Sequence, residues 1–253
     1  MNTIKFLGTA GARFAVTRQI RKSGGMWLSL DDTNILIDPG PGSLVRCLSS
    51  KPKLNPMNLD AIILSHRHID HSNDVNIMIE AMTNGGRKKK GVVFAPTDAL
   101  DDDPVVLLHF RNHVEGIVKL KEGGSYKVGN LEFSTPILHI HDCETYGIRF
   151  QGSKTSVSYI ADTKYFDGIE SYYSSDVLIL NVVLVDSKEY INHLSISDAE
   201  RIIQSIKPKT AILTHFGLSM IKARPWDIAK KLSQKTGCNV IAASDGMILS
   251  LDE

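Results

Sequence analysis

The sequence predicts an α/β chain, and three observations lead to that class. Short apolar runs rich in β-branched residues recur along the 253 residues and are separated by Gly, Asn, Asp or Pro. Between some of these runs, apolar residues recur at helical spacing. No Pro/Ser-rich linker or low-complexity tract divides the chain. We therefore expect a single domain over residues 1–253, built from two αβ halves that meet near residues 120 to 130.

The first half is predicted to alternate strands with helices. Val75, Ile79 and Met82 recur at helical spacing between Ser72, the expected N-cap, and a terminating Gly85. A second, short helix follows a proline over residues 44–48. The expected strands are 3–7, 26–30, 35–38, 60–64 and 92–95.

The second half is predicted to begin with antiparallel strands over 117–141, turning at Gly123-Gly124 and Gly129-Asn130. A weaker pattern before them suggests a helix over 101–113. Ser195 or Ser197 opens a helix that ends before residue 208, and a proline opens another over 225–237. The remaining expected strands are 147–150, 157–160, 177–183, 211–213 and 240–242.

Composition narrows the classes of function. A formal net charge of +1 gives no general attraction to nucleic acid. The three cysteines have no CxxC spacing, which argues against a disulfide framework and against a cysteine-rich zinc knuckle. Residues 1–11 do not form a signal peptide, and no run approaches about eighteen apolar residues. We expect a soluble cytoplasmic protein with no membrane partner and no strong nucleic-acid signal.

The most informative stretch follows the apolar run over 60–65 and reads His66-Arg67-His68-Ile69-Asp70-His71. Four of these six residues are of types that bind zinc and similar divalent ions. A strand that ends in such a cluster presents it at a sheet edge, where sites are usually built. The alternative is a polar loop with chance histidines, which the density of ligand types disfavours.

Further ligand-type residues stand where apolar strands of the second half stop, namely His141, Asp162 and His215. A lone histidine at a strand end is usually capped or solvated. Separate strand ends of one sheet converge in space, however, so three of them beside a four-ligand cluster favour a shared metal site.

The chain resembles the metallo-β-lactamase superfamily, whose HxHxDH signature is matched by residues 66–71. The resemblance covers nearly the whole chain and implies a four-layer αβ/βα sandwich, with two sheets face to face and helices outside. Asp38 looks like the early aspartate that supports the family's site. The implied cofactors are two divalent ions, zinc first, with manganese or iron also suitable. The implied ligands are His66, His68 and His141 for one ion, Asp70, His71 and His215 for the other, and Asp162 as a bridge.

Three residues narrow the branch of the superfamily. True β-lactamases of the best-known subclass carry a cysteine where Asp162 stands, and flavodiiron oxidoreductases carry Glu where His68 stands. His193 is similar to an acid–base histidine of the phosphodiesterase branch, which includes ribonuclease Z and the cyclic phosphodiesterase of the carbon-phosphorus lyase pathway. Only twenty residues separate His141 from Asp162, where the tRNA enzymes insert a long arm.

The resemblance therefore implies a phosphodiesterase acting on a small phosphodiester, cyclic phosphate or nucleotide. Two ions about 3.5 to 4 Å apart would generate a hydroxide and neutralise the phosphoryl oxygens. Asp70 and Asp162 would orient that hydroxide, and His193 would protonate the leaving group. Thioester or lactone hydrolysis, RNA processing and non-catalytic metal binding stay open as alternatives, and His193 could instead orient Asp162 or a helix start.

The sequence indicates candidate substrate-binding residues less clearly than metal ligands. Arg13 and Arg18 lie in the loop between the first two strands and suit a phosphorylated small molecule, although a solvated loop is equally consistent. Ser195, close to His193, is a third candidate. Phe14 and Trp226 could stack on a base or sugar, but a core or interface role is favoured for each.

Several features have no assigned role in the sequence. These are the basic run 87–90, for which a solvated position is favoured, and His109, His113, His139 and Cys143. The oligomeric state is also open, a homodimer included.

Overall fold

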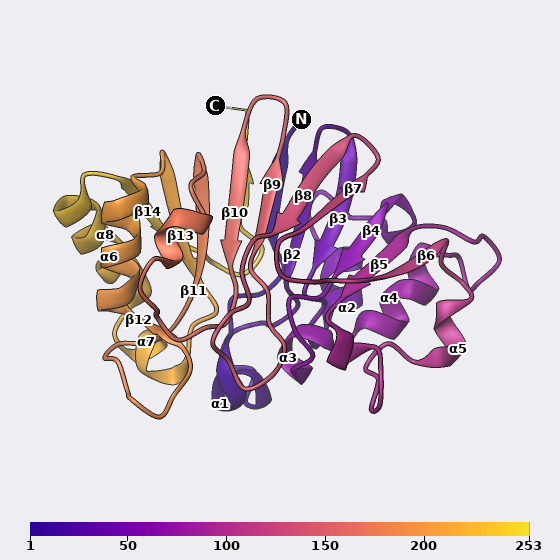
Figure 1. The fold of residues 1–253 in the computed structure, drawn as a ribbon, viewed down its shortest axis with the longest axis horizontal. Coiled ribbons are helices and arrows are strands. Elements are labelled where there is room, and N and C mark those ends of the chain that lie inside the picture. The colour runs from indigo at the N-terminus through magenta and orange to yellow at the C-terminus, as the bar shows by residue number, and fades with distance from the viewer. Residues whose placement is uncertain (253) are drawn as a thin grey trace.

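The computed structural model describes residues 1–252. Two sheets face each other, and helices cover the outer face of each, which gives four layers (Figure 1). Side chains from both sheets form the central core, among them Phe6 and Phe150, which are fully buried. Burying each such ring contributes about 1.5 to 3 kcal/mol to folding. This arrangement matches the predicted αβ/βα sandwich.

The first sheet has seven strands and is mixed. Its N-terminal strands pair antiparallel, and its later strands pair parallel because helices connect them. Asp31 and Asp32 both have positive φ, as the two-residue hairpin turn requires. In spatial order the strands are β15 (Ile248–Ser250), β1 (Thr3–Phe6), β2 (Met26–Leu30), β3 (Thr33–Ile37), β4 (Ala61–Ile63), β5 (Val92–Ala95) and β6 (Gly116–Lys119).

The second sheet begins in sequence with β7, at Gly124. Four neighbouring strands, β14, β13, β11 and β10, run parallel, so their carboxyl ends meet at one edge. A short strand, β12 (Leu194–Ser195), pairs with the end of β11. The others in spatial order are β14 (Asn239–Ala242), β13 (Thr210–Thr214), β11 (Val177–Leu184), β10 (Ser156–Ile160), β9 (Ile148–Gln151), β8 (Leu131–Thr135) and β7 (Gly124–Val128).

Helices form the outer layers and one edge. The first sheet is covered by α2 (Ser43–Ser49), η1 (Pro56–Asn58), α4 (Val75–Met82), η2 (Thr97–Ala99) and α5 (Leu108–Arg111). The second is covered by η3 (Ile169–Tyr172), α6 (Ile196–Ile206), α7 (Leu218–Lys222) and α8 (Pro225–Thr236). Figure 1 shows α7 near two further short helices at the edge opposite the termini, α1 (Ala12–Thr17) and α3 (Ile69–Ser72).

The helix predicted from Ser72 is wrong in its start. Ser72 ends α3, where its hydroxyl donates to the carbonyls of Arg67 and His68 at 2.9 and 3.0 Å. The helix is interrupted between α3 and α4. The Asp74 amide donates to the Pro39 carbonyl and not to a carbonyl one helical turn earlier in the chain.

Two predictions for the middle of the chain are also wrong. The helix expected over 101–113 is reduced to the four residues of α5. Gly123-Gly124 is not a hairpin turn, because β6 belongs to the first sheet and β7 to the second. The turn at Gly129-Asn130 does join antiparallel strands, β7 and β8. No helix within residues 1–252 is long and apolar enough to cross a membrane.

Candidate metal centre

The first group of candidate ligands lies where β4 leads into α3. His66 follows the end of the strand, His68 is the N-cap of α3, and Asp70 and His71 lie in its single turn. A loop that coils at once into a helix brings the four side chains together over six residues. His66 and His71 are buried, with ring centroids 4.0 Å apart.

The second group comes from the carboxyl ends of strands in the other sheet. Asp162 follows β10, His215 follows β13, and His141 lies in the segment between β8 and β9. His215 has φ of +59°. A non-glycine residue in this region costs about 1 to 3 kcal/mol and persists where its surroundings impose it. Here the adjoining Phe216 pairs with Thr9 and Gly11 through backbone hydrogen bonds of 2.8 and 3.1 Å.

The structure brings all seven candidate ligands together. Within each of two groups the ligand atoms lie within 4.8 Å of one another: His66, His68 and His141 in one, and Asp70, His71 and His215 in the other. Asp162 lies between the groups. Its Oδ2 is 3.4 Å from His215 Nε2 and 3.9 Å from His66 Nε2.

The hydrogen bonding of the imidazole rings indicates that the candidate ligands fit divalent cations. His66 Nε2 is buried and has no hydrogen-bond partner. His141 Nε2 faces His68 Nδ1 at 3.1 Å, and His71 Nε2 faces His215 Nε2 at 3.2 Å. Two neutral imidazole nitrogens can share one hydrogen at most, and an unpaired buried polar atom is costly. Nitrogen and carboxylate donors that converge in this way suit zinc, manganese or iron.

The far nitrogens of three rings are held by other groups. His71 Nδ1 lies 2.9 Å from Asp38 Oδ2, and His66 Nδ1 lies 3.0 Å from Ser65 Oγ. His141 Nδ1 lies 3.0 Å from the carbonyl of Asn192. Such partners fix the orientation of a ligating ring and increase its affinity for a metal.

Asp38 is the centre of a buried polar network that joins the two sheets. Its carboxylate accepts from the Ser65 amide and hydroxyl, each at 2.7 Å, and from the Tyr159 hydroxyl at 2.9 Å. Asn181 Nδ2 donates to Tyr159 Oη at 2.9 Å and to Asp162 Oδ1 at 2.8 Å. Sequence patterns did not single out Tyr159 or Asn181, although an asparagine within the apolar run 177–184 was a visible signal.

Burial and neighbouring charge shift the titration of these groups. Burial raises the cost of charge on His66, and nearby histidines add to it, so its pKa lies well below the ordinary value. At His71 burial acts in the same direction, but the carboxylates, Asp38 first, outweigh it and raise the pKa well above that value. Burial would raise the pKa of Asp162, yet His215 and His193 outweigh it and lower the pKa.

A cavity of about 720 Å³ opens beside the ligands and is lined by His68, Asp162 and His193, among others. His193 precedes β12, and its Nδ1 lies 3.6 Å from Asp162 Oδ2, buried and without a hydrogen-bond partner. Burial lowers the pKa of His193, and the Asp162 charge partly opposes this. A half-buried imidazole at the wall of a cavity is placed to exchange a proton with a bound molecule.

The three expected substrate residues have different positions. Arg13 lines the cavity, on α1. Arg18 is not among the lining residues, and its guanidinium lies 5.7 Å from the centroid of the Phe14 ring. Ser195 is fully buried, and its hydroxyl forms a capping box with Asp198 at the start of α6. This position argues against the expected contact between Ser195 and a substrate.

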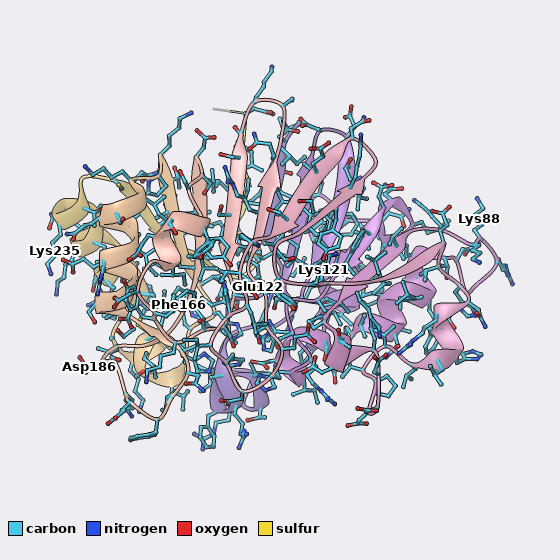
Figure 2. The ribbon with its side chains drawn as sticks, viewed as in Figure 1. Lys88, Lys121, Glu122, Phe166, Asp186 and Lys235 are labelled. Atoms are coloured by element: carbon cyan, nitrogen blue, oxygen red, sulfur yellow. The ribbon has the colours of Figure 1, made fainter. Side chains whose placement is uncertain are left out.

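The other residues singled out in the sequence lie outside the ligand groups. His139 is buried between the Tyr173 hydroxyl, 2.7 Å away, and the Asp162 carbonyl, and burial lowers its pKa to about 4. His109 and His113 lie on and just after α5. The basic run 87–90 lies at the same end of the molecule as α5. Figure 2 shows its Lys88 at the end opposite Lys235 of α8.

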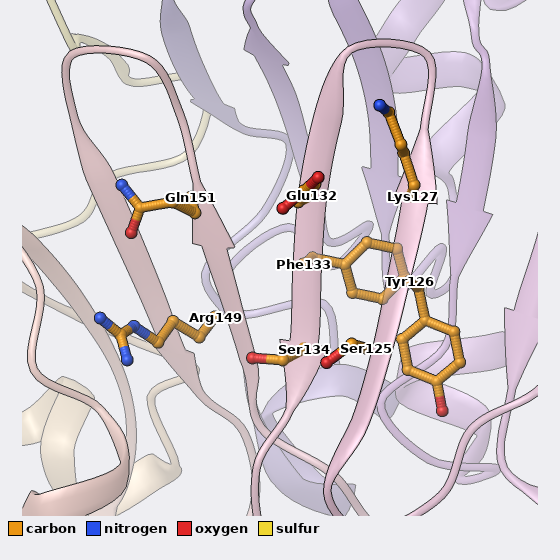
Figure 3. Close-up of a pocket in the computed structure, with 8 residues that line it drawn as sticks. All are labelled: Ser125, Tyr126, Lys127, Glu132, Phe133, Ser134, Arg149 and Gln151. Atoms are coloured by element: carbon orange, nitrogen blue, oxygen red, sulfur yellow. The ribbon is translucent and has the colours of Figure 1, made fainter.

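A second hollow, an open groove of about 520 Å³, crosses the outer face of β7, β8 and β9. Figure 3 shows its polar side chains, including Lys127, Glu132 and Arg149. Among the described residues that line this groove there is no histidine or cysteine, so it shares no ligand with the metal centre.

Comparison with known proteins identifies the class. A family model described as the beta-lactamase superfamily domain matches residues 33–216, a span that contains all seven candidate ligands and the strands that carry them. This chain belongs to the metallo-β-lactamase superfamily and has its fold, which confirms the resemblance seen in the sequence. The family assignment supports a metal-dependent hydrolase.

Individual relatives are similar to this chain over nearly its whole length. MJ1374 of Methanocaldococcus jannaschii, described as uncharacterized, is 30% identical over 257 residues, covering 98% of this chain and 94% of that protein. The crystal structure of the metallo-beta-lactamase fold protein YhfI from Bacillus subtilis has a TM-score of 0.82 at 20% identity, over 98% of both chains.

Two further solved structures lie in the expected branch. A diphosphatase from the PhnP family has a TM-score of 0.71 at 21% identity, over 98% of this chain and 96% of that one. The short form of human tRNase Z has a TM-score of 0.72 at 17% identity, over 99% and 100% of the two chains. At these identities the structures establish a common fold.

Proposed function

We propose that this chain is a phosphodiesterase that uses two divalent metal ions, zinc first, to hydrolyse a small phosphodiester, cyclic phosphate or nucleotide. The observation that carries the proposal is the position of His193. It lines the cavity beside the candidate ligands, and its Nδ1 lies 3.6 Å from Asp162. A departing alkoxide needs a proton in phosphodiester hydrolysis, and a histidine at this position can supply one.

The size of the substrate is inferred from the segment between His141 and Asp162. Its twenty residues are occupied by a connecting loop and the hairpin of β9 and β10, both part of the second sheet. No residues are left there for an arm that grips a large folded RNA. The similarity to a PhnP-family diphosphatase also supports a small phosphorylated substrate.

The two ions, when bound by the seven ligands, would activate a water molecule and neutralise charge on the phosphoryl oxygens. The chain's own residues supply the rest. Asp162 and Asp70 offset the positive charge of the site, and Asp38 orients His71 from behind. Arg13, exposed on the cavity wall, is placed to contact a phosphate oxygen. His193, whose Nδ1 lies 3.6 Å from Asp162 Oδ2, is placed to donate a proton to the leaving oxygen.

Replacing His193 by alanine tests the proposal. We expect the variant to keep its metal content by elemental analysis and to lose at least about tenfold in turnover of a 2′,3′-cyclic nucleotide, whose alkoxide leaving group needs a proton, as for loss of a general acid. His109→Ala is the matched control, because His109 lies on α5, outside the ligand groups.

The same preparation distinguishes the alternatives. Turnover of a thioester or a lactone without turnover of a phosphodiester would replace the proposed reaction with hydrolysis at carbon. Unchanged phosphodiester turnover in His193→Ala would remove His193 from the mechanism. Absence of turnover of all phosphodiesters, thioesters and lactones tested would indicate a metal-binding protein without catalytic activity.

A further inference from the structure

The cavity has an aromatic wall that the proposed chemistry does not use. Phe14 and Tyr190 both line it, yet they are 59% and 82% exposed. They belong to segments far apart in the sequence, α1 and the connection between β11 and β12. Large apolar side chains left in water beside a cavity are typical of a binding surface.

The backbone that carries Phe14 is anchored on its other side. Ala15 and Val16 are buried and pack with Leu218 and Ile221. The Arg18 guanidinium lies 5.7 Å from the Phe14 centroid. Because the helix is fixed by its buried face, the ring is presented to the cavity without needing to move.

Hydrogen bonds hold the segment that carries Tyr190 on both sides of that residue. The Glu189 carbonyl accepts from Lys164 Nζ at 2.9 Å, and Asn192 Nδ2 donates to Asp142 Oδ1 at 2.7 Å. Tyr190 is three residues before His193, and both residues line the same cavity. An aromatic side chain therefore lines the same cavity as the histidine that we propose as the proton donor to the leaving group.

We propose that Phe14 and Tyr190 form a subsite for the planar base of a nucleotide, an inference that rests on the proposed phosphodiesterase function. Any base presents a flat π-face to an aromatic ring, so this binding needs no hydrogen-bond pattern in the wall. Arg13, one residue before Phe14, lines the same cavity and supplies positive charge for the attached phosphate. The cavity volume of about 720 Å³ is in the range for a small organic ligand.

A pair of ligands that differ only in the base tests this subsite. AMP and ribose 5-phosphate share the sugar and the phosphate, and their binding to the full-length, zinc-loaded protein can be measured by titration calorimetry. We expect AMP to bind more tightly. Phe14→Ala and Tyr190→Ala should each weaken AMP binding by at least about fivefold, the lower limit for a lost stacking contact, and leave ribose 5-phosphate unchanged.

Trp226→Ala is the matched control. Trp226 is 52% exposed and has Arg224 over its ring at 5.6 Å, much as Phe14 has Arg18, but it does not line the cavity. This variant should bind both ligands as the unaltered protein does. Phe14→Leu, which keeps apolar bulk without a flat face, should also weaken AMP selectively, and thermal melting of each variant verifies its folding.

Three results would overturn the subsite: equal affinity for AMP and ribose 5-phosphate, equal loss of both in the variants, or unchanged AMP binding accompanied by a change in sedimentation mass. The last would make the aromatic wall an interface between copies of the chain. Turnover of bis(p-nitrophenyl) phosphate is measured separately. A protein without that turnover that still prefers AMP would refute the phosphodiesterase and keep the base subsite.

Discussion

Single buried polar residues hold the candidate ligands in place. Asn181 uses both hydrogens of its amide, one for Tyr159 and one for Asp162, and the Tyr159 hydroxyl then donates to Asp38. Because a carboxylate only accepts, the direction of these hydrogen bonds is fixed. One side chain in β11 therefore orients the candidate bridging carboxylate and, through Tyr159, contacts the carboxylate that supports His71.

Asn181→Ala should lower both metal affinity and stability. The substitution leaves Asp162 Oδ1 without its Asn181 donor and removes a buried hydrogen-bond partner of Tyr159. We expect the free energy of unfolding of the metal-free protein to fall by about 1 to 3 kcal/mol. Zinc affinity, measured by competition with a chromophoric chelator, should fall by about 10- to 100-fold.

Tyr159→Phe provides the comparison, since it keeps the bond from Asn181 to Asp162 and removes the bond to Asp38. Zinc affinity that is unchanged in Asn181→Ala would show that Asp162 needs no orientation by Asn181.

Among the elements, the connection from β1 into α1 positions one wall of the cavity. A Cβ at Gly11 would lie 2.2 Å from the His215 carbonyl oxygen and 2.4 Å from the His215 ring. Only glycine allows this close approach of two backbones. At Gly40 a Cβ would similarly meet the carbonyl oxygen of Asp70, at 2.0 Å. Two candidate ligands of the same group, Asp70 and His215, are thus packed against glycines from loops outside the signature motif.

Gly11→Ala should displace His215 and α1 together. We expect reduced zinc stoichiometry by elemental analysis and a melting temperature lower by several degrees, because the backbone must move to relieve the contact. Gly116→Ala is the matched control: its added Cβ would meet only Val92 methyl groups, at 3.6 and 3.9 Å. Full zinc occupancy in Gly11→Ala would contradict this account of the element.

At the scale of the whole molecule, the metal centre lies between the two halves. His66, His68, Asp70 and His71 follow a strand of the first sheet, and the remaining ligands belong to the second. The last strand, β15, returns to the first sheet and pairs with β1, so each half depends on the other. A cation bound by ligands from both halves would therefore stabilise the whole folded protein against unfolding.

Zinc should therefore raise the melting temperature of the chelator-treated protein. A ligand at about 100 times its Kd adds about 2.7 kcal/mol, which corresponds to about 5 °C or more for a chain of this length. Scanning calorimetry with and without zinc measures the shift, and Asp162→Ala should reduce it. Identical melting with and without zinc would show that zinc does not bind the folded protein in preference to the unfolded chain.

The sequence by itself determined the fold class, most strand positions and the ligand residue types, because periodicity and β-branched runs report local burial. Strand ends pointed to His141, Asp162 and His215, since parallel strands share an edge. Tertiary structure decided which side chains meet: it buried Ser195 in a helix cap, placed the Arg18 guanidinium over the Phe14 ring, and left Phe14 exposed on the cavity wall. The link from Asn181 to Asp38 through Tyr159 depends on the pairing of β10 with β11 and the packing of one sheet on the other, contacts that local sequence patterns do not encode.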